Sequence, residues 1–268
     1  MKMFKWLFRI IILVTIAYLI YIVVYPFMVD VSSLKRKNPD LTAMMKYRIE
    51  QWEREGKKVK IKKVWVPLHK ISQYLVKAVL IGEDDKFYKH SGFDIEGIKK
   101  AIEKDIKEKK LKYGGSTITQ QLAKNLYLSP SKNPVRKIQE AIITWRLEKT
   151  LSKKRILELY LNVAEWGEGI FGAEAAARHY FGKSASELSP MEAARLAASL
   201  PNPIKYSPAG NSRFVEKRAN LIYFIMQKRG IIKEEYTEPH EEESLPVLVE
   251  DQQNPSNQKE QSDQTPLK

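Results

Sequence analysis

The apolar residues of the chain follow three different spacings. Residues 10–29 form one apolar run of twenty residues without a charge, which is long enough to cross a hydrocarbon layer of ~30 Å as a single helix. In residues 59–66 lysines and apolar residues roughly alternate, which predicts one short strand. Beyond Pro67 the apolar residues recur every three or four positions. This spacing predicts a body built mostly of α-helices.

Capping signals mark where these helices begin and end. A short polar helix is expected over residues 41–55, and the last helix is expected from about Arg213 to a stop at Gly230. Further helix starts are predicted at Asp94, at Asn133-Pro134, at Ser152 and at Ser189-Pro190, where Glu192 completes a capping box.

The apolar run is interpreted as a retained membrane anchor. It is too long for the apolar segment of a typical signal peptide, and no Ala-x-Ala cleavage site follows it. The basic residues on its two sides are nearly balanced, but long domains translocate with little regard to charge. We therefore expect residues 1–9 to stay in the cytoplasm and the rest to lie outside. The absence of cysteine is compatible with an oxidising compartment.

Charge is distributed unevenly between the body and the C-terminal tail. The chain carries a net charge of +14, but residues 237–268 hold eight acidic and two basic residues, so residues 1–236 carry +20. Such a body suits lipid headgroups, diphosphates or nucleic acid, and the anchor makes the lipid interpretation the simplest. The tail, rich in Glu, Gln, Ser and Pro, is expected to be disordered.

The stretch "GGSTITQQLAKNLYL", residues 114–128, places two hydroxyls ahead of a polar helix. Thr117 with Gln120 fits a capping box, which is an ordinary helix start. It leaves Gln121, Lys124 and Asn125 as hydrogen-bond donors with one cation near the positive end of a helix, which favours a phosphate-like ligand. A nucleotide P-loop is excluded, because no lysine follows the glycines at the required spacing.

The stretch "GEDDKFYKHSGFD", residues 82–94, begins with three adjacent carboxylates at a predicted helix end. Acidic residues at a helix C-terminus oppose the helix dipole, although a solvated acidic turn explains them as well. His90 is expected to have a structural role. A metal site of His90 with Asp84 and Asp85 lacks any specific ligand spacing.

A third stretch, residues 133–162, places Arg136 and Glu140 one helical turn apart beside Lys137. A surface ion pair contributing under ~0.5 kcal/mol is the alternative. That alternative is the prediction for Glu148 and Glu158.

In order and spacing, five motifs resemble those of the peptidoglycan glycosyltransferases, family 51: "EDDKFYKHSGFD", "GGSTITQQLAKN", "RKIQE", "KKRILELYLN" and "AARLAASLPNP". The match covers about residues 67–208, and "YLNVAEWGEGIFGAEAAARHYFGKSASELSPMEAARLAASLPNP" is most similar to the monofunctional, biosynthetic kind. The resemblance implies a mostly α, lysozyme-like fold with a smaller membrane-facing lobe, here roughly residues 95–113. The four isoleucines of that lobe would meet lipid or the core. Their amphipathic spacing favours the core for most of them.

The resemblance also implies a reaction. Glu83 is expected to be the base that deprotonates the acceptor 4-hydroxyl of lipid II, while the growing glycan chain is the donor and inverts at C1 with release of polyprenyl diphosphate. Glu140 is the second catalytic glutamate, which orients the cationic cluster or a divalent ion. The substrate-binding residues implied for the diphosphate-sugar are Ser116, Thr117, Gln121, Lys124, Asn125, Arg136 and Lys137. No cofactor is required by the sequence, but Mg²⁺ or Mn²⁺ is compatible with it.

These inferences predict a five-part organisation: a cytoplasmic stub (1–9), a transmembrane anchor (10–29), a linker with a short helix and strand (30–66), the glycosyltransferase domain (67–235) and a disordered acidic tail (236–268). The expected location is the bacterial cytoplasmic membrane, with the catalytic domain on the extracytoplasmic side. The expected partners are lipid II, the growing glycan, the membrane and other cell-wall synthesis proteins, with no nucleic acid.

Two alternatives stay open from the sequence. A lysozyme-like lytic enzyme also needs a general-acid glutamate in a helical cleft, but it releases no diphosphate and would leave Lys124, Arg136 and Lys137 without a role. A membrane-tethered scaffold or polyanion binder would depend on charge and not on Glu83. Loss of function in an uncharged Glu83 variant would distinguish the enzyme from the scaffold.

Overall fold

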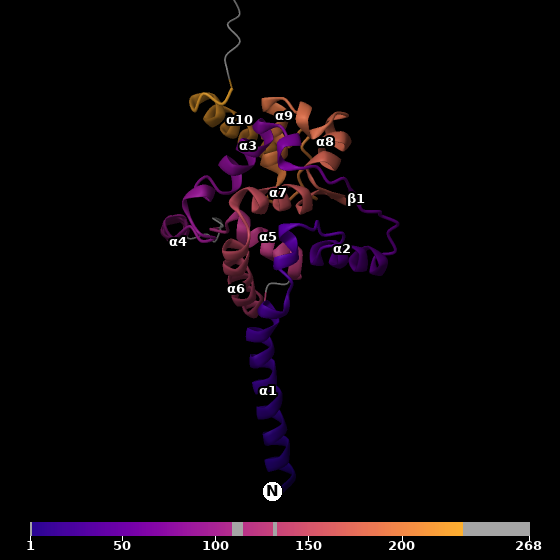
Figure 1. Cartoon of the computed structure of the whole chain (residues 1–268), viewed down its shortest axis with the longest axis vertical. Helices are drawn as coiled ribbons and strands as arrows, with labels where there is room; N and C mark the ends of the chain where they lie inside the picture. The colour runs from indigo at the N-terminus through magenta and orange to yellow at the C-terminus, as the bar shows by residue number, and fades with distance from the viewer. Residues whose placement is uncertain (1, 109–114, 131–132, 233–268) are drawn as a thin grey trace, which may run out of the picture. The chain divides into compact units, whose positions relative to one another are not determined.

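The computed structural model describes residues 2–108, 115–130 and 133–232. The first element is helix α1 (Lys2–Met28), which contains the apolar run (Figure 1). In the described part of the chain it is the one helix long and apolar enough to cross a membrane, with a mean hydropathy of 2.7 over its most apolar window. Most of its apolar side chains are exposed. The rest of the protein therefore does not bury most of this apolar surface.

The body is mostly helical, as the apolar spacing predicts. Its α-helices are α2 (Ala43–Arg54), α3 (Gln73–Glu83), α4 (Ile95–Glu108), α5 (Ile118–Tyr127), α6 (Pro134–Thr150), α7 (Lys153–Val163), α8 (Ala173–Phe181), α9 (Pro190–Ser199) and α10 (Arg213–Lys228). Short 3-10 helices lie at Ser32–Lys35, Leu68–Lys70, Phe87–Lys89 and Ala185–Glu187.

Several predicted helix starts are confirmed by cap hydrogen bonds. The side chains of Asn133 and Ser152 accept from backbone N–H groups at the starts of α6 and α7, and the capping box at Ser189 and Glu192 forms. Asp94 Oδ1 accepts from the Gly97 N–H at the start of α4. These signals are local in sequence, so they do not depend on what packs around the helices.

The small sheet is shorter than the alternation of residues 59–66 predicts. Its strands are β1 (Lys62–Lys63), β2 (Glu165–Gly167) and β3 (Ile170–Phe171), in the order β1-β3-β2. β1 pairs in parallel with β3, Lys62 opposite Ile170, and β2 pairs antiparallel with β3 across an irregular register. A strand can pair only as far as its partner extends, and β3 has two residues.

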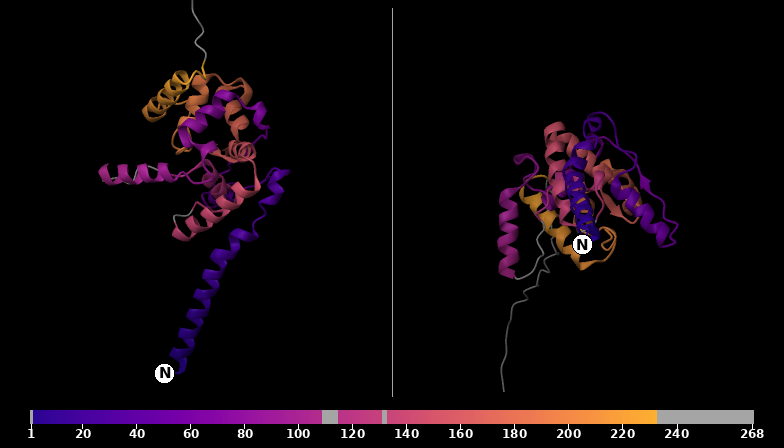
Figure 2. Two further views of the ribbon diagram at one scale, coloured as in Figure 1. Left: turned by 60° about the vertical axis from the view of Figure 1, so that its left-hand side comes forward. Right: turned by 90° about the horizontal axis from the view of Figure 1, so that it is seen from below.

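Helices α3, α9 and α10 pack against one another (Figures 1 and 2). The buried face of α9 consists largely of alanines, which let the two neighbouring helices approach closely: Ala193, Ala194, Ala197 and Ala198. Helix α5 packs against α6 and α7. The C-terminal end of α3 and the N-terminal half of α5 are thereby fixed by the core, and both carry predicted site residues.

Helix α1 is joined to the body where it ends. The Arg146 guanidinium on α6 donates to the carbonyl oxygens of Pro26 and Val29. The Tyr25 hydroxyl donates to the Tyr127 carbonyl at 2.7 Å, and the Tyr127 hydroxyl donates to the Asp30 carbonyl at 2.7 Å. Burial raises the pKa of the Tyr127 phenol, so this hydroxyl stays protonated and available as a donor.

The expectation that most isoleucines of α4 lie in the core is wrong for Ile95. Its side chain is 59% exposed, and Ile98 is only partly buried. Ile95 is the first residue of α4, and helical spacing fixes only that residues share a face, not what covers that face. The side chains of Ile102 and Ile106, and the rest of the expected lobe at 109–113, lie outside the described residues.

Gly172, immediately before α8, has a φ of +87°, and a Cβ there would lie 2.8 Å from the Asn162 carbonyl oxygen. We expect Gly172→Ala to lower the free energy of unfolding by about 1–3 kcal/mol, because the backbone conformation is one that only glycine adopts readily and the added methyl would overlap a backbone atom. Urea unfolding of the detergent-solubilised protein measures this.

The control for this prediction is Gly210→Ala. A Cβ at Gly210 meets its nearest atoms at 3.4 Å or more, so the expected change is within about 0.5 kcal/mol. Equal stability of the two variants would contradict the strain at Gly172.

Candidate active site

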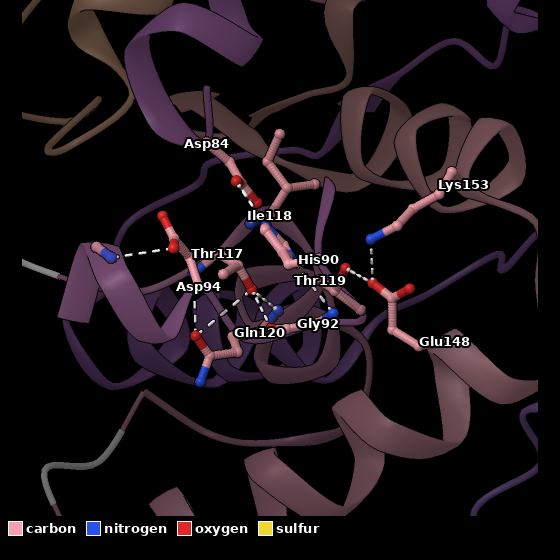
Figure 3. A network of polar contacts seen from close by, with 11 residues as sticks. Asp84, His90, Gly92, Asp94, Thr117, Ile118, Thr119, Gln120, Glu148 and Lys153 are labelled. Carbon is pink, nitrogen blue, oxygen red and sulfur yellow. Dashed lines mark hydrogen bonds and ion pairs between the residues drawn. The ribbon is translucent and has the colours of Figure 1, made fainter. Parts of the chain in front are cut away.

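The three adjacent carboxylates at the end of α3 point in three directions. Glu83, the last residue of α3, faces a cavity. Asp84 is buried and accepts hydrogen bonds from the Ile118 N–H at 3.0 Å and from His90 at 2.8 Å (Figure 3). Asp85 forms a bidentate pair with Arg229. Three adjacent negative charges are tolerated because each carboxylate has its own hydrogen-bond or ion-pair partners.

His90 has the structural role predicted for it. The Gly92 N–H donates to His90 Nδ1 at 3.1 Å, so Nδ1 carries no proton and Nε2 donates to Asp84. The two contacts join residues within the segment after α3, and Asp84 links that segment to the first turn of α5 by accepting from the Ile118 N–H. His90 is thus occupied in holding the loop and does not face the cavity.

Thr117 caps α5 as predicted and also binds the loop. Its hydroxyl accepts from the Gln120 N–H at 3.2 Å and donates to the Gly92 carbonyl at 2.7 Å, while Gln120 Oε1 accepts from the Thr117 N–H (Figure 3). The side chain is buried. Its predicted contact with substrate would therefore compete with two existing hydrogen bonds.

The predicted ion pairs of Glu148 and Glu158 form, with Lys153 and Arg155, but their expected location at the surface is wrong. Glu148 is 8% exposed, pairs with Lys153 at 2.8 Å and accepts from the Thr119 hydroxyl (Figure 3). Glu158 is half-buried and accepts from the Leu68 N–H at 2.9 Å. Both link helices to distant segments, which helical spacing alone cannot reveal.

Glu83 is held from three elements. The amide nitrogen of Gln121 on α5 donates to Glu83 Oε2 at 2.8 Å, and Arg218 on α10 donates to Glu83 Oε1 at 3.2 Å. The hydroxyl of Tyr160 on α7 donates to the Gln121 side-chain oxygen at 3.0 Å, which fixes the amide orientation. The result is a carboxylate with both oxygens anchored.

Burial raises the pKa of the Glu83 carboxyl, since only 10% of the side chain is exposed. The hydrogen bond from Gln121 and the charges of Arg218 and Lys124 oppose this rise. A carboxyl with a raised pKa is a stronger base once ionised, so Glu83 has the property expected of a general base. Such a group is lost as a base when the pH falls through its pKa.

A cavity of about 280 Å³ brings Glu83 together with most of the predicted diphosphate residues. Its polar lining comes from α3, α5, α6 and the turn before α5: Glu83, Ser116, Gln120, Gln121, Lys124, Arg136, Lys137 and Glu140. Three cations thus line one wall. The sequence separates them by up to thirteen positions, and the packing of α5 on α6 brings them together.

Glu140 is buried in the base of this cationic wall, with 4% of its side chain exposed. Arg136 donates to it at 2.7 Å, and Lys137 pairs with its other oxygen. Lys124 is largely buried, which lowers the pKa of its ammonium, while the nearby Glu140 carboxylate opposes that shift. An anionic ligand would favour the charged ammonium in the same way.

Two further cavities adjoin this one. A cavity of about 300 Å³ shares Glu83 and Ser116, reaches α4, and also contains Thr117. Another of about 200 Å³ shares Gln121 and Lys124 and contains Asn125. Glu83 thus lies at a junction between cavities. Thr117 and Asn125 line these adjoining cavities and not the cationic one.

Three charged residues near these cavities were not predicted. Arg48 and Glu165 pair at 2.9 Å in the cavity with Asn125, and Arg218 contacts Glu83. Arg48 precedes the matched motifs and Arg218 follows them, so only tertiary contacts reveal their place. Tyr160 lies within the fourth motif, where its spacing gave no sign of a role beside Gln121.

No cluster of three His, Cys, Asp or Glu side chains that could hold a metal ion occurs in the described part of the chain. Glu140 is engaged by Arg136 and Lys137, and Glu83 by Gln121 and Arg218. These side chains do not form a divalent-ion site on their own. The sequence requires no divalent ion, and the ligands of a compatible Mg²⁺ or Mn²⁺ would have to come mainly from a bound diphosphate.

Comparison with known proteins identifies relatives over most of the chain. The family model described as transglycosylase matches residues 50–227. A biosynthetic peptidoglycan transglycosylase of Nitrosospira multiformis is 50% identical over 194 residues, covering 72% of this chain and 84% of that protein. Proteins of the same name from Azoarcus sp. and Janthinobacterium sp. are 52% identical over 177 residues and 43% identical over 221 residues, covering 66% and 82% of this chain and 77% and 94% of theirs.

Proposed function

Because the chain belongs to the transglycosylase family, we propose that it polymerises lipid II into glycan strands, with Glu83 as the general base. It is a glycosyltransferase of peptidoglycan synthesis with the mostly helical, lysozyme-like fold of that family. The observation that carries the proposal is the placement of one desolvated carboxylate, Glu83, beside a cationic wall of Lys124, Arg136 and Lys137.

In the proposed reaction Glu83 accepts the proton of the 4-hydroxyl on the acceptor sugar of lipid II. The hydroxyl oxygen forms a bond to C1 of the terminal lipid-linked sugar of the growing chain. The bond from C1 to the diphosphate oxygen breaks, and polyprenyl diphosphate leaves with the electron pair. Attack opposite the leaving group inverts C1 from α to β, and the proton on Glu83 passes to solvent.

The cationic wall would bind the donor diphosphate and stabilise its developing charge. Lys124, Arg136 and Lys137 come from two packed helices, so their positions are fixed before substrate arrives, which is the arrangement that stabilises a transition state most effectively. Buried Glu140 holds Arg136 and Lys137 in place. Ser116 lies 3.5 Å from the Lys137 ammonium and is available to a phosphate oxygen.

The acceptor would enter from the adjoining cavity of about 300 Å³. That cavity shares Glu83 with the cationic one, so one carboxylate oxygen can meet a hydroxyl there while C1 of the donor lies at the junction. Hydrolysis of a finished glycan would not use the cationic wall, because no diphosphate leaves.

Purified full-length protein with labelled lipid II tests this function. We expect a polymer that lysozyme digests, formed at the same rate with and without penicillin. Release of short glycan fragments from preformed peptidoglycan, with no polymer from lipid II, would support a lytic enzyme instead. Binding of lipid II vesicles without any product would support a scaffold.

Helix α1 and neighbouring apolar side chains support a position at the cytoplasmic membrane. Ile138 and Trp145 on α6 are exposed, and α6 packs against α1. An apolar surface continuous with a spanning helix suits the lipid boundary, where a polyprenyl-linked substrate resides. We place the catalytic domain on the extracytoplasmic side, together with the other proteins of cell-wall synthesis.

The absence of cysteine allows a direct test of this orientation. A Lys58→Cys variant places one thiol on an exposed position of the body, and we expect a membrane-impermeant maleimide to label it in intact spheroplasts. A Lys5→Cys variant, on the short N-terminal side of the span, should be labelled only after lysis. The opposite labelling pattern would reverse the proposed topology.

A further inference from the structure

Arg218 lies on α10, fifteen residues beyond the end of the last matched motif, yet it contacts the carboxylate proposed as the base. Its Nη2 donates to the Gly82 carbonyl oxygen at 2.6 Å and to Glu83 Oε1 at 3.2 Å. One nitrogen therefore binds both the backbone just before Glu83 and the Glu83 side chain. This fixes the orientation of the carboxylate relative to the end of α3.

The packing of α10 explains how Arg218 reaches Glu83. Val215, Ala219, Ile222 and Met226 form the buried face of α10, which packs against α9 and α3. Gly82 has no side chain at the crossing point, where a Cβ would lie 3.2 Å from Ile222 Cδ1 and 3.7 Å from Arg218 Nη2. A Cβ at position 82 would therefore crowd Ile222 on α10, while the Arg218 guanidinium lies at ordinary contact distance.

The guanidinium is held there at an energetic cost. Nε of Arg218 is buried and has no hydrogen-bond partner among the described residues. A buried donor without a partner costs about 1–3 kcal/mol, so a role in stability alone explains the arrangement poorly. A buried donor without a hydrogen-bond partner in a native structure calls for an explanation. A role in catalysis is such an explanation, because functional groups are retained even where they lower stability.

The groups that face Glu83 come from four elements. Arg218 approaches from α10, Gln121 and Lys124 from α5, and the Tyr160 hydroxyl acts through Gln121 from α7. Helix α9, also packed against α3, is followed by Leu200 and Pro201, which line the cavity with apolar surface. Among the described residues Lys124 makes no hydrogen bond to Glu83, so Arg218 is the cation in hydrogen-bond contact with the carboxylate.

We propose that Arg218 is a positioning residue that orients Glu83 and keeps it ionised for proton abstraction. The proposal rests on the assignment of Glu83 as the general base. Apolar walls and burial favour the neutral carboxyl, while a guanidinium in contact favours the carboxylate. Without Arg218, Glu83 would be protonated over a wider pH range and less precisely aimed at the acceptor hydroxyl.

The test is the pH dependence of kcat for lipid II polymerisation by the full-length enzyme. In Arg218→Gln we expect the acidic limb of the profile to move upward by about one pH unit, because a nearby opposite charge typically changes a carboxyl pKa by that amount or more. On the acidic limb turnover should fall by up to about tenfold, and it should recover at higher pH. Arg218→Lys, which keeps one charge but not the planar fork, should move the limb by less.

The matched control is Arg229→Gln. Arg229 ends the same helix and pairs with Asp85, two residues from Glu83, so this variant removes the same charge without touching the Glu83 carboxylate. We expect its acidic limb to match that of the unmodified enzyme. Arg218→Lys keeps the test decisive if Arg218→Gln does not fold, as judged by a thermal melt.

Three results would overturn the proposal. An unchanged acidic limb in a folded Arg218 variant, or an equal shift in Arg229→Gln, would show that Arg218 does not act on Glu83. A rise in KM alone would show a substrate contact instead. If Glu83 is not the general base, the result is different: Glu83→Gln then retains turnover, independently of the pH profile of the Arg218 variants.

Discussion

Glu83→Gln is expected to abolish polymerisation while the fold is retained. Loss of a general base typically costs ~10² to 10⁴ in rate. Glutamine has nearly the same shape, and its side chain can still contact Arg218 and Gln121, so the cavity should stay closed around it. An amide nitrogen cannot accept the proton of a sugar hydroxyl. Turnover of labelled lipid II at saturation, together with a thermal melt, measures the two effects separately.

Glu216→Gln is the matched control for this variant. Glu216 lies on α10, is exposed and lines none of the three cavities. Its replacement makes the same chemical change but removes no predicted proton acceptor, so turnover should change by less than about threefold. Near-normal polymerisation by a folded Glu83→Gln enzyme would remove Glu83 from its role and with it the proposed mechanism.

The second large effect is expected in the cationic wall. Replacing Lys124 or Arg136 with alanine should lower turnover at saturating lipid II. A cation aimed at a leaving group in a desolvated site contributes several kcal/mol of transition-state stabilisation, and the variant loses that contribution. Binding to vesicles should hardly change. Loss of Arg136 also leaves buried Glu140 with fewer partners, so a thermal melt accompanies this variant.

Lys35→Ala and Arg36→Ala are the controls, because both residues are exposed and lie just after α1. A lysine or arginine near lipid headgroups contributes ~1 kcal/mol to membrane attraction. These variants should weaken vesicle co-sedimentation and leave turnover at saturation unchanged, and raised salt should remove the difference between them and the unmodified protein. Equal, modest losses of turnover in all four variants would mean that the wall is only part of a basic surface.

The sequence by itself determined the structural elements that depend on interactions between residues close together in the chain. The caps at Asn133, Ser152 and Ser189 use side chains within a few positions of the backbone groups that they satisfy, so the chain needs no tertiary contact to specify them. The apolar run of α1 is likewise defined by composition and length. The family was identifiable because five motifs occur in order, and the family comparison confirms it.

The candidate site was predictable only through that resemblance. Residue type and spacing indicated a phosphate-like ligand near Lys124, but they left Glu83 in what could equally be a solvated acidic turn. The structure distinguishes the three carboxylates by their surroundings: Asp84 faces His90, Asp85 faces Arg229, and of the three Glu83 alone lines the cationic cavity. Neighbours in sequence have different surroundings because the chain leaves the helix at that point.

Tertiary structure alone decided which distant groups act on one another. Arg218 meets Glu83 because α10 crosses α3 at Gly82, 136 positions earlier in the chain. Glu148 became a buried partner of Lys153 and Thr119, although its helix position suggested solvent. Ile95 stayed exposed despite its amphipathic spacing. Periodicity specifies which residues share a face, whereas the packing of whole elements specifies what that face meets.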